Sequence, residues 1–375
     1  MTELKTEARR IRIGGRVQGV GFRPHVYRLA RSLNLGGWVR NDGDGVSIHI
    51  EGAAELLERF QIRLLTEIPP QAQAILKESR PAKWTGCREF LILASQPAAG
   101  AVVPHDLPPC PECVTELFDP KNRRYRYPFI SCSQCGPRYS LIEALPYDRS
   151  RTGMAGFDLC PDCQQEYVNP DDRRFHAQSI GCPACGPVLR WLPGPFGGCA
   201  ELDQNNPIDQ AARAEGSAWQ ECLDTLKDGC VVAIRAVGGY QLAADATNPA
   251  AIDRLRRIKQ RPDKPLAVLF ANLAAIEAAG ISLPPAAAEA LTSPARPIVP
   301  LDRNHDCMLP QVLAPGLNSI GVMLPNSPLQ TLLLTDFGGP LVMTSANRSG
   351  EPMLTEFQAL PEIDGVLDHD RPITN

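Results

Sequence analysis

The pattern of hydrophobic and polar positions near the N-terminus predicts one small mixed domain. Ile11 and Ile13 alternate with arginines, as in a half-buried strand, and the segment after Pro24 has the apolar spacing of a helix. Turn residues between two alternating segments indicate a hairpin. The predicted strand, helix, two hairpin strands, second helix and last strand lie at residues 11–13, 25–35, 38–41, 46–52, 53–65 and 89–93. The order βαββαβ predicts a ferredoxin-like sandwich in residues 1–96.

Two further parts of the chain are patterned differently. Residues 105–191 have little apolar periodicity and are rich in cysteine, arginine and proline, so they cannot build an ordinary hydrophobic core. Regular α/β patterning resumes in residues 215–375, where a buried strand at CVVAIR precedes a basic helix whose apolar residues share one face. Loose segments containing proline and glycine separate the parts. We therefore predict an α+β multidomain protein, since single cores stop growing near ~250 residues.

Composition narrows the class of protein. The 375 residues carry a formal net charge of −4 and a pI near 5.9, so no global basic field attracts nucleic acid. No segment approaches the ~18 uninterrupted apolar residues of a membrane span, and the N-terminus lacks the apolar core of a signal peptide. Thirteen cysteines without an export signal favour reduced thiols and metal ligation. We expect a cytoplasmic protein with no membrane partner.

Eight of the cysteines form two copies of one pattern. CPEC is answered by CSQC in the first copy and CPDC by CPAC in the second, and each cysteine of the second copy lies 50 positions after its counterpart. Each copy offers four thiolates at the spacing of a closed, tetrahedral structural zinc site, in which metal binding replaces the missing core. Sequential and interleaved pairing of the copies are both open. The predicted Zn²⁺ ligands are Cys110, Cys113, Cys132, Cys135, Cys160, Cys163, Cys182 and Cys185.

Arginines and aromatic residues are combined in the cysteine-rich part, in the segments NRRYRY and DRRF. This composition is found in zinc proteins that bind nucleic acid, which gives one alternative function. We favour a solvated basic face or packing within the protein, because the overall charge is acidic.

Five further cysteines lie outside the repeated pattern. Free cysteine packs as a small hydrophobic residue, so we expect ordinary buried thiols at Cys87, Cys199, Cys222, Cys230 and Cys307.

A glycine-rich loop, GGRVQGVGFR, joins the first predicted strand to the first helix. In such a loop successive backbone N–H groups converge on an anion, and the helix dipole adds positive potential. Arg23 is placed to hold a phosphate with two hydrogen bonds. On the glycines alone, a plain tight turn is an equal explanation. The candidate phosphate-binding loop consists of Val17, Gln18, Gly19, Val20, Gly21 and Phe22.

The string VQGVGFR, followed by GWVRN and DGDGV, resembles the acylphosphatase family over most of the first domain. The resemblance implies that Arg23 binds the phosphate and that Asn41 orients the attacking water. An acyl phosphate already has a good leaving group, so positioning and charge neutralisation suffice without a protein nucleophile.

A basic cluster and a hydroxyl-rich segment mark the third part. Three cations within six residues stand at the entrance to a strand, where they suit a triphosphate. A lone charge run of this kind is more often a solvated face. The segment TSAN follows an apolar strand and offers hydroxyl and amide groups for phosphate oxygens and a Mg²⁺ shell. No GxxxxGK[ST] motif occurs, so this is not a P-loop protein. The candidate nucleotide-binding residues are Lys259, Arg261, Lys264, Thr344, Ser345 and Asn347.

Together, GGYQLAADATN, KxRxxxKPLAVLF, NSIGVMLPNSPLQTLLL and TSAN resemble the YrdC-like domain. That family condenses ATP with a carbamate to give an acyl adenylate and pyrophosphate. The resemblance implies ATP with Mg²⁺ as substrate, with the three cations holding the phosphates and Ser345 and Asn347 lining the nucleotide pocket. Relatives in hydrogenase maturation often carry histidine where Gln241 stands, so the role of Gln241 stays open.

An acylphosphatase, two four-cysteine zinc ribbons and a YrdC-like α/β domain in this order resemble the HypF-type hydrogenase-maturation carbamoyltransferases. The resemblance implies that the first site releases carbamate from carbamoyl phosphate and that the third makes carbamoyl adenylate. A C-terminal domain then passes the group to a cysteine of HypE on the way to the cyanide of [NiFe]-hydrogenase. The chain ends DHDRPITN with no sign of that domain, so we expect an N-terminal part of the enzyme. A tRNA threonylcarbamoyl-adenylate synthase is the alternative, and the acylphosphatase part argues against it.

Overall fold

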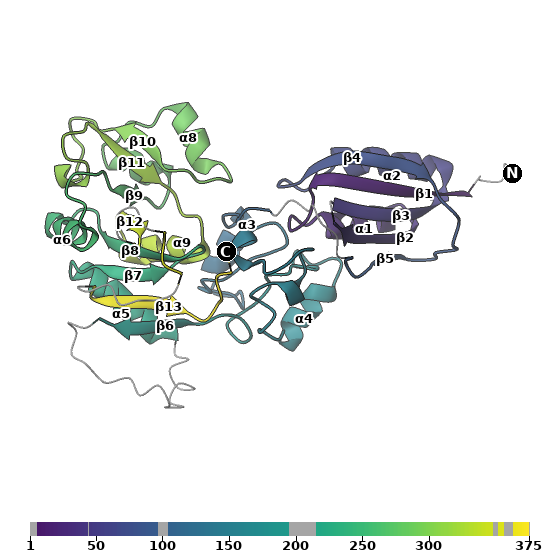
Figure 1. Cartoon of the computed structure of the whole chain (residues 1–375), viewed down its shortest axis with the longest axis horizontal. Coiled ribbons are helices and arrows are strands. Elements are labelled where there is room, and N and C mark those ends of the chain that lie inside the picture. The colour runs from purple at the N-terminus through teal and green to yellow at the C-terminus, as the bar shows by residue number, and fades with distance from the viewer. Residues whose placement is uncertain are drawn as a thin grey trace. The chain divides into compact units, whose positions relative to one another are not determined.

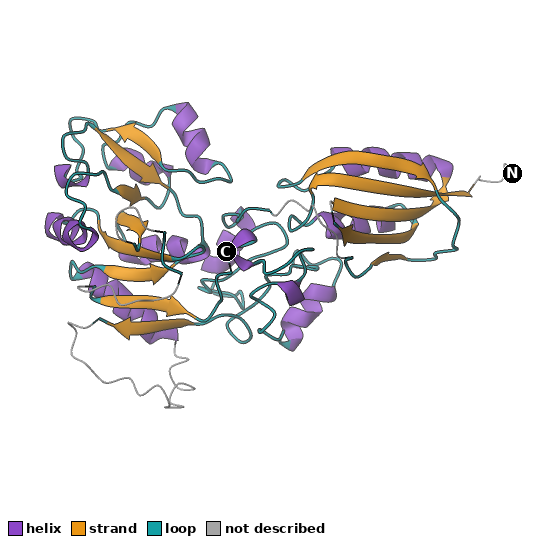
Figure 2. Cartoon of the chain, in the orientation of Figure 1, coloured by secondary structure: helices purple, strands orange, loops and turns teal. Residues whose placement is uncertain are grey.

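The computed structural model describes residues 6–43, 45–96, 104–194, 215–347, 352–355 and 363–374. The chain divides into two compact units. One comprises residues 1–113, 130–186 and 374–375, and the other residues 114–129 and 187–373. Each unit contains one β-sheet among its described residues (Figures 1 and 2).

The first unit has a five-stranded sheet in the order β4-β1-β3-β2-β5. Neighbouring strands are antiparallel except β2 and β5, which are parallel. Apolar residues of helices α1 and α2 pack with Ile11, Ile13 and Ile48 in one core, so both helices cover the same face (Figure 1). The elements are β1 (Thr6–Arg16), α1 (Phe22–Ser32), β2 (Gly36–Asp42), β3 (Gly45–Ala53), α2 (Ala54–Thr66), β4 (Gln73–Pro81) and β5 (Phe90–Ile92).

The prediction of a ferredoxin-like sandwich is confirmed. The strand predicted at 89–93 is also present, but its assignment as the strand that completes the βαββαβ order is wrong. The strand that completes βαββαβ is β4, which pairs with β1. The strand predicted at 89–93 corresponds to β5, an additional strand beside β2. The segment QAILKESRP forms an edge strand with mostly exposed residues, so it lacks the alternation of apolar and polar positions that marks a half-buried strand.

In the cysteine-rich part, the first cysteine pair of each copy lies at the start of a short helix. These helices are α3 (Pro111–Phe118) and α4 (Pro161–Val168). Single turns of 3₁₀-helix, η1 (Tyr139–Leu141) and η2 (Arg149–Arg151), lie between them. Around α4 half of the residues in the small buried apolar cluster are cysteines, which agrees with the absence of apolar periodicity.

The second unit has an eight-stranded mixed sheet in the order β10-β11-β9-β12-β8-β7-β13-β6. Three consecutive residues of β7 are buried, so both faces of the sheet are covered. The core on one face includes residues of α6, α7 and α8, whereas α5 packs along β6 and β13. The strands are β6 (Leu189–Pro193), β7 (Val232–Arg235), β8 (Tyr240–Asp245), β9 (Ala267–Leu269), β10 (Val299–Asp302), β11 (Ser319–Met323), β12 (Leu341–Ser345) and β13 (Gly365–His369). The helices are α5 (Glu215–Lys227), α6 (Pro249–Lys259), α7 (Leu273–Ala278), α8 (Pro285–Thr292), η4 (Gln311–Leu313) and α9 (Pro328–Phe337).

Strand β6 begins inside the segment 105–191 and pairs antiparallel with β13, so the end of the cysteine-rich part joins the sheet of the second unit. Among the described residues, no helix combines the length and the apolar character needed to cross a membrane.

Candidate active sites and cysteine clusters

The predicted phosphate loop connects β1 to α1. Gly19 and Gly21 have φ of 70° and 75°, in the left-handed region that favours glycine, and Gly21 is the N-cap of α1. Arg23 therefore lies in the first turn of a helix whose N-terminus begins in the loop. The Gln18 amide donates two hydrogen bonds of 2.9 Å to carbonyls at the turn between β2 and β3, which fixes the loop to the sheet. This is the geometry of an anion site at a helix N-terminus.

The structure brings Arg23 and Asn41 to one place. Both side chains are buried, with 8% and 1% exposed. The backbone carbonyl of Tyr147 accepts from Arg23 Nη2 at 3.3 Å and from Asn41 Nδ2 at 3.5 Å. Asn41 Oδ1 is buried and has no hydrogen-bond partner among the described residues. A buried acceptor without a donor suits a bound water, which fits the role that the family resemblance implies for Asn41.

The cysteine-rich part adds residues to this site that the sequence analysis does not identify. Arg23 Nη2 forms an ion pair with Asp148 Oδ1 at 2.9 Å, and Nη1 donates to Ser95 Oγ at 3.1 Å. Arg138, only 1% exposed, donates through Nε to the Gly19 carbonyl. No motif marks the turn that carries Asp148, so the sequence offers no signal for it.

Two cavities meet at Arg23. One has a volume of about 20 Å³ and is lined by loop residues and Tyr147. The other, about 480 Å³ and open to solvent, is lined by residues that include Asp148 and His176. Burial lowers the pKa of His176 to about 4, and the positive charge of Arg23 acts in the same direction, so this imidazole is neutral near pH 7. The arrangement can bind an anion with Arg23 and the helix N-terminus and can hold a water at Asn41.

The eight cysteines of the repeat form two clusters with sequential pairing. In each cluster the four sulfurs lie within 4.8 Å of one another. Neighbouring sulfurs are 3.5–3.8 Å apart in the first cluster and 3.6–3.7 Å apart in the second. Tetrahedral Zn–S bonds of about 2.3 Å place sulfurs about 3.8 Å apart, so both clusters fit structural zinc. The clusters are Cys110, Cys113, Cys132 and Cys135, and Cys160, Cys163, Cys182 and Cys185.

Arginines of the two aromatic-rich segments are used inside the protein. Arg173 donates to the sulfurs of Cys110 and Cys113 at 3.0 and 3.4 Å, where its charge offsets that of the thiolates. Arg174 and Arg124 are 4% and 1% exposed. This burial supports packing within the protein over a basic face for nucleic acid.

The expectation of buried thiols holds for only one of the four remaining cysteines that the structure describes. Cys222 is buried on α5, which confirms the prediction there. The prediction is wrong for Cys87, Cys230 and Cys307, which are partly exposed because they lie in connections outside the helices and strands. Cys199 lies outside the described residues.

A buried carboxylate on β3 holds the loop before β5. The side chain of Glu51 is 0% exposed and accepts from Thr85, from the Cys87 backbone N–H at 2.8 Å and from His49 Nε2 at 2.8 Å. Burial raises the pKa of Glu51, but these hydrogen bonds outweigh it and lower the pKa to about 2. His49, Glu51 and Cys87 have metal-ligand atoms within 4.8 Å, yet the carboxylate is already satisfied by N–H and O–H donors. Glu51 therefore has a structural role, since it fixes the loop before β5 to strand β3.

We expect Glu51→Gln to lower the free energy of unfolding by roughly 3 kcal/mol at pH 7, since one pKa unit corresponds to about 1.4 kcal/mol. The folded-state pKa lies below the ordinary value of 4.5, so this stability is present above pH 4.5 and is lost as the pH falls towards 2. Urea unfolding of the parent and variant at pH 5–8 checks the prediction. Glu58→Gln is the matched control, because Glu58 is 62% exposed. A difference between parent and Glu51→Gln that grows below pH 4.5 would contradict it.

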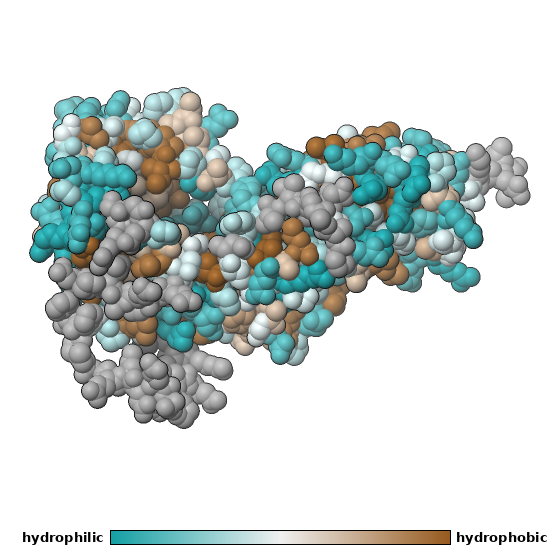
Figure 3. Space-filling model, in the orientation of Figure 1, coloured by the Kyte–Doolittle hydropathy of each residue, from teal (hydrophilic) through white to brown (hydrophobic). Residues whose placement is uncertain are grey.

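The predicted nucleotide site is assembled around Lys259. Lys259 is 3% exposed, and its Nζ donates to the Ser345 carbonyl and to the carbonyl and Oδ1 of Asn347, the last two at 2.9 Å. Burial lowers the pKa of Lys259 to about 8, and the charges of Arg261 and Lys264 add to the effect, so the three cations are close in space. Figure 3 shows a hydrophilic surface over α6, the helix that ends at Lys259.

The other predicted nucleotide-binding residues differ in how far their side chains are exposed to solvent. Arg261 donates to the Pro265 carbonyl at 2.6 Å, while its Nε is buried without a partner among the described residues. Lys264 is exposed. Pairing of β12 with β8 places Ser345 opposite Gln241, and Gln241 Oε1 accepts from Gln330 at 3.1 Å. Thr344 precedes Ser345 on β12 and is partly buried.

Arg256 shapes the basic loop, although the sequence analysis does not select it. It lies on α6 and is 6% exposed. In the run RLRRIK nothing distinguishes it from its exposed neighbour Arg257 except the helical spacing towards the core. Its guanidinium donates to the backbone carbonyls of Arg261, Pro262, Lys264, Val312 and Leu313.

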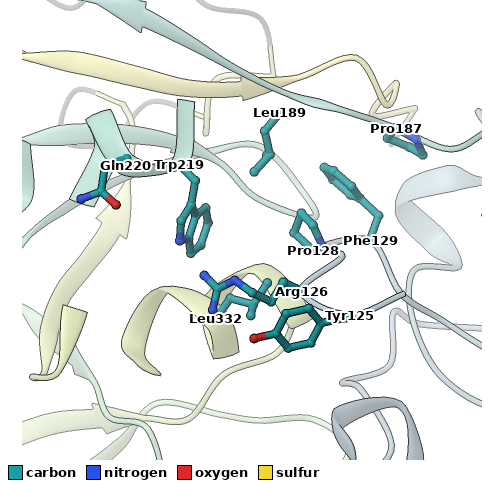
Figure 4. A pocket seen from close by; sticks show the side chains of 9 residues that line it. All are labelled: Tyr125, Arg126, Pro128, Phe129, Pro187, Leu189, Trp219, Gln220 and Leu332. Atoms are coloured by element: carbon teal, nitrogen blue, oxygen red, sulfur yellow. The ribbon is translucent and has the colours of Figure 1, made fainter. Parts of the chain in front are cut away.

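A separate pocket of about 340 Å³ in the second unit is lined largely by apolar and aromatic residues (Figure 4). On one wall Arg126 forms a two-bond ion pair with Asp336, which also accepts from Trp219 Nε1 at 2.6 Å. The charge of Arg126 is thereby neutralised, and the pocket contains none of the predicted site residues.

Comparison with known proteins gives three family matches along the chain. The family described as acylphosphatase matches residues 9–83, the HypF finger matches residues 110–142 and 159–192, and the Sua5/YciO/YrdC family, described as telomere recombination, matches residues 224–375. Carbamoyltransferase HypF2 of Cupriavidus necator is 47% identical over 389 residues, which cover 97% of this chain. The chain belongs to the HypF family. It spans about half the length of the curated relatives it matches, since the alignment covers 46% of HypF2.

Two other HypF proteins agree with this placement. Carbamoyltransferase HypF of a Synechocystis species is 45% identical over 383 residues, which cover 99% of this chain and 47% of that protein. A crystal structure of full-length HypF in the phosphate- and nucleotide-bound form superposes with a TM-score of 0.88 at 37% identity, over 99% of this chain and 47% of that one. The HypF fold of acylphosphatase, finger and YrdC-like parts is therefore confirmed.

Proposed function

We propose that this chain carries two half-reactions of a carbamoyltransferase of [NiFe]-hydrogenase maturation. The first is hydrolysis of carbamoyl phosphate at the loop with Arg23 and Asn41, and the second is formation of carbamoyl adenylate from ATP around Lys259. The proposal is supported above all by the presence of both sites in one chain that matches HypF proteins over 97% of its length.

In the first half-reaction the loop amides and the Arg23 guanidinium bind the phosphoryl group and neutralise its charge. Asn41 Oδ1, the buried acceptor without a partner, holds the attacking water by one of its hydrogens. The water oxygen bonds to phosphorus while the bond from phosphorus to the bridging oxygen breaks, so inorganic phosphate and carbamate are the products. The imidazole of His176 is neutral near pH 7, so it adds no positive charge at this site.

In the second half-reaction a carbamate oxygen attacks the α-phosphorus of ATP, and pyrophosphate leaves. ATP enters as its Mg²⁺ complex, and the metal neutralises part of the charge on the phosphates. The positive charges of Lys259, Arg261 and Lys264 stabilise the negative charge that develops on the leaving pyrophosphate. Ser345 and Asn347 are placed by Lys259 to line the nucleotide pocket, with Thr344 beside them.

The cysteine clusters complete the proposal as two structural Zn²⁺ sites, because four thiolates leave no coordination position for a substrate. Free thiols stay reduced in the cytosol, so we propose that the protein acts in the cytoplasm. Transfer of the carbamoyl group to a HypE-type acceptor is proposed for the whole enzyme, of whose length this chain spans about half.

Release of pyrophosphate from ATP and Mg²⁺, measured with and without carbamoyl phosphate, tests the proposed function. We expect release only when carbamoyl phosphate is present, because its hydrolysis supplies the carbamate. Release that ignores carbamoyl phosphate but needs threonine and bicarbonate would make the chain a threonylcarbamoyl-adenylate synthase and refute the proposal.

A further inference from the structure

We propose that Asp148, together with the backbone carbonyl of Tyr147, selects carbamoyl phosphate over other acyl phosphates by accepting hydrogen bonds from the carbamoyl NH₂ group. The inference rests on the proposed hydrolysis at Arg23 and Asn41 and names the specificity-determining residue of that site.

The two acceptors come from a segment that neither neighbouring family match contains. Arg23 and Asn41 lie within the acylphosphatase match at residues 9–83. Tyr147 and Asp148 lie between the two finger matches, 110–142 and 159–192. This connection nevertheless reaches both candidate catalytic residues. The Tyr147 carbonyl lies 3.3 Å from Arg23 Nη2 and 3.5 Å from Asn41 Nδ2, and the Asp148 carboxylate lies 2.9 Å from Arg23 Nη2. The connection therefore adds chemistry to a site whose phosphate-binding parts are already complete.

The connection is held firmly on both sides of the acceptors. The Tyr147 N–H donates to the side chain of Gln18 in the phosphate loop at 3.4 Å, and Tyr147 is 3% exposed. The Arg149 N–H donates to Gln178 Oε1 at 2.7 Å, and the Arg149 guanidinium donates to the carbonyls of Gln178 and Ile180 at 2.8 Å. A carbonyl and a carboxylate fixed in this way remain aimed at the site.

Acceptors at this position do not help to bind a phosphate. A carboxylate beside a phosphoryl dianion repels it, and in the unliganded protein it also competes with phosphate for Arg23. When phosphate takes the guanidinium, the Asp148 carboxylate loses its partner and needs a donor. The carbamoyl group supplies one, since its NH₂ carries two N–H bonds. An acetyl group has a methyl in the same place and offers neither acceptor a hydrogen bond.

Discrimination of this kind is large when the site is built to bind an N–H. A site with buried acceptors rejects an analogue that lacks the donor by about 10⁴–10⁵-fold, whereas a methyl-sized difference in an apolar pocket is worth only about 10–200-fold. Asp148 is partly exposed, with 26% of its side chain accessible, so we expect a preference of roughly 10²-fold for carbamoyl over acetyl phosphate.

The test compares kcat/KM for carbamoyl phosphate and acetyl phosphate in the full chain, in Asp148→Ala and in Asp148→Asn. In Asp148→Ala we expect kcat/KM for carbamoyl phosphate to fall by roughly 10²-fold, while that for acetyl phosphate stays level or rises because Arg23 is released. Asp148→Asn keeps one acceptor oxygen and should retain part of the preference. Asp158→Ala, an exposed aspartate of the same connection, is the matched control, and zinc content reports on folding.

Each other outcome overturns the inference in a distinct way. Equal gains for both substrates in Asp148→Ala would show that Asp148 only blocks Arg23, and equal losses would show that it only positions the guanidinium. A parent chain that hydrolyses both phosphates equally well lacks the selection although the proposed function stands. A parent chain that hydrolyses neither refutes the proposed function itself.

Discussion

Replacing Arg23 with alanine is expected to lower kcat/KM for carbamoyl phosphate hydrolysis by roughly 10³-fold, because removal of a single preorganised donor to a developing charge costs about 10²–10³-fold. Arg23 supplies two donor nitrogens and a full charge, and it is 8% exposed, so solvent does not replace it. The variant also leaves the Asp148 carboxylate unpaired next to the phosphate, which adds repulsion. Release of inorganic phosphate at low substrate concentration measures the loss.

Two further variants show whether the loss of activity is specific to Arg23 and how much of it is due to the positive charge. Arg31→Ala removes an exposed arginine from the same helix, and we expect it to hydrolyse carbamoyl phosphate at the parent rate. Arg23→Lys keeps the charge but loses the two-pronged grip, so its kcat/KM should fall between those of Arg23→Ala and the parent. Equal activity of Arg23→Ala and the parent would place the phosphate elsewhere.

The cysteine ligands could be predicted because metal ligation depends on residue type and local spacing. Cys110 directly precedes α3 and Cys113 lies in its first turn, and their partners follow at the same interval in both copies. Which pairs share a cluster depends on how the chain folds back, so only the structure shows the sequential pairing. The same limit hides Arg173, whose contact with the first cluster spans 60 positions.

Only the part of the phosphate site that is contiguous in sequence could be predicted. The loop and Arg23 are contiguous in sequence, and glycines at left-handed φ leave a recognisable pattern. Asp148 stands 125 positions from Arg23, and a lone aspartate in a turn is indistinguishable from a solvated one. A contact of that length arises from packing between parts of the fold that no local pattern encodes.

The charge pattern predicted the basic cluster but not which of its cations are buried or what each of them binds. The sequence shows Arg256, Arg257 and Lys259 as neighbouring cations, whereas the structure buries two of them and exposes Arg257. Arg256 binds five backbone carbonyls, and Lys259 binds the TSAN segment. Burial of a cation is favourable only where such acceptors surround it, and that information is tertiary. Edge strand β4 was missed for a related reason, since its pairing with β1 rather than its own pattern makes it a strand.

Replacing Lys259 with alanine is expected to lower carbamoyl phosphate-dependent pyrophosphate release by roughly 10²–10³-fold and to leave phosphate release from carbamoyl phosphate unchanged. The ammonium group lies in the second unit and binds Ser345 and Asn347. The variant therefore loses the positive charge that stabilises the leaving pyrophosphate, and it loses the hydrogen bonds that order the nucleotide pocket. Arg257→Ala, an exposed residue of the same helix, is the matched control. Parallel loss of both activities in Lys259→Ala would instead indicate general unfolding.

The pH dependence separates the charge of Lys259 from its anchoring role. Burial lowers the pKa of Lys259 to about 8, so in the free protein the ammonium loses its proton as the pH rises through that value. Only the charged form attracts the phosphates, and the apparent KM for ATP should therefore increase above pH 8. Lys259→Arg stays charged throughout this range and should remove the increase. A KM for ATP that rises equally in the parent and in Lys259→Arg would assign the titration to another group and leave Lys259 as an anchor alone.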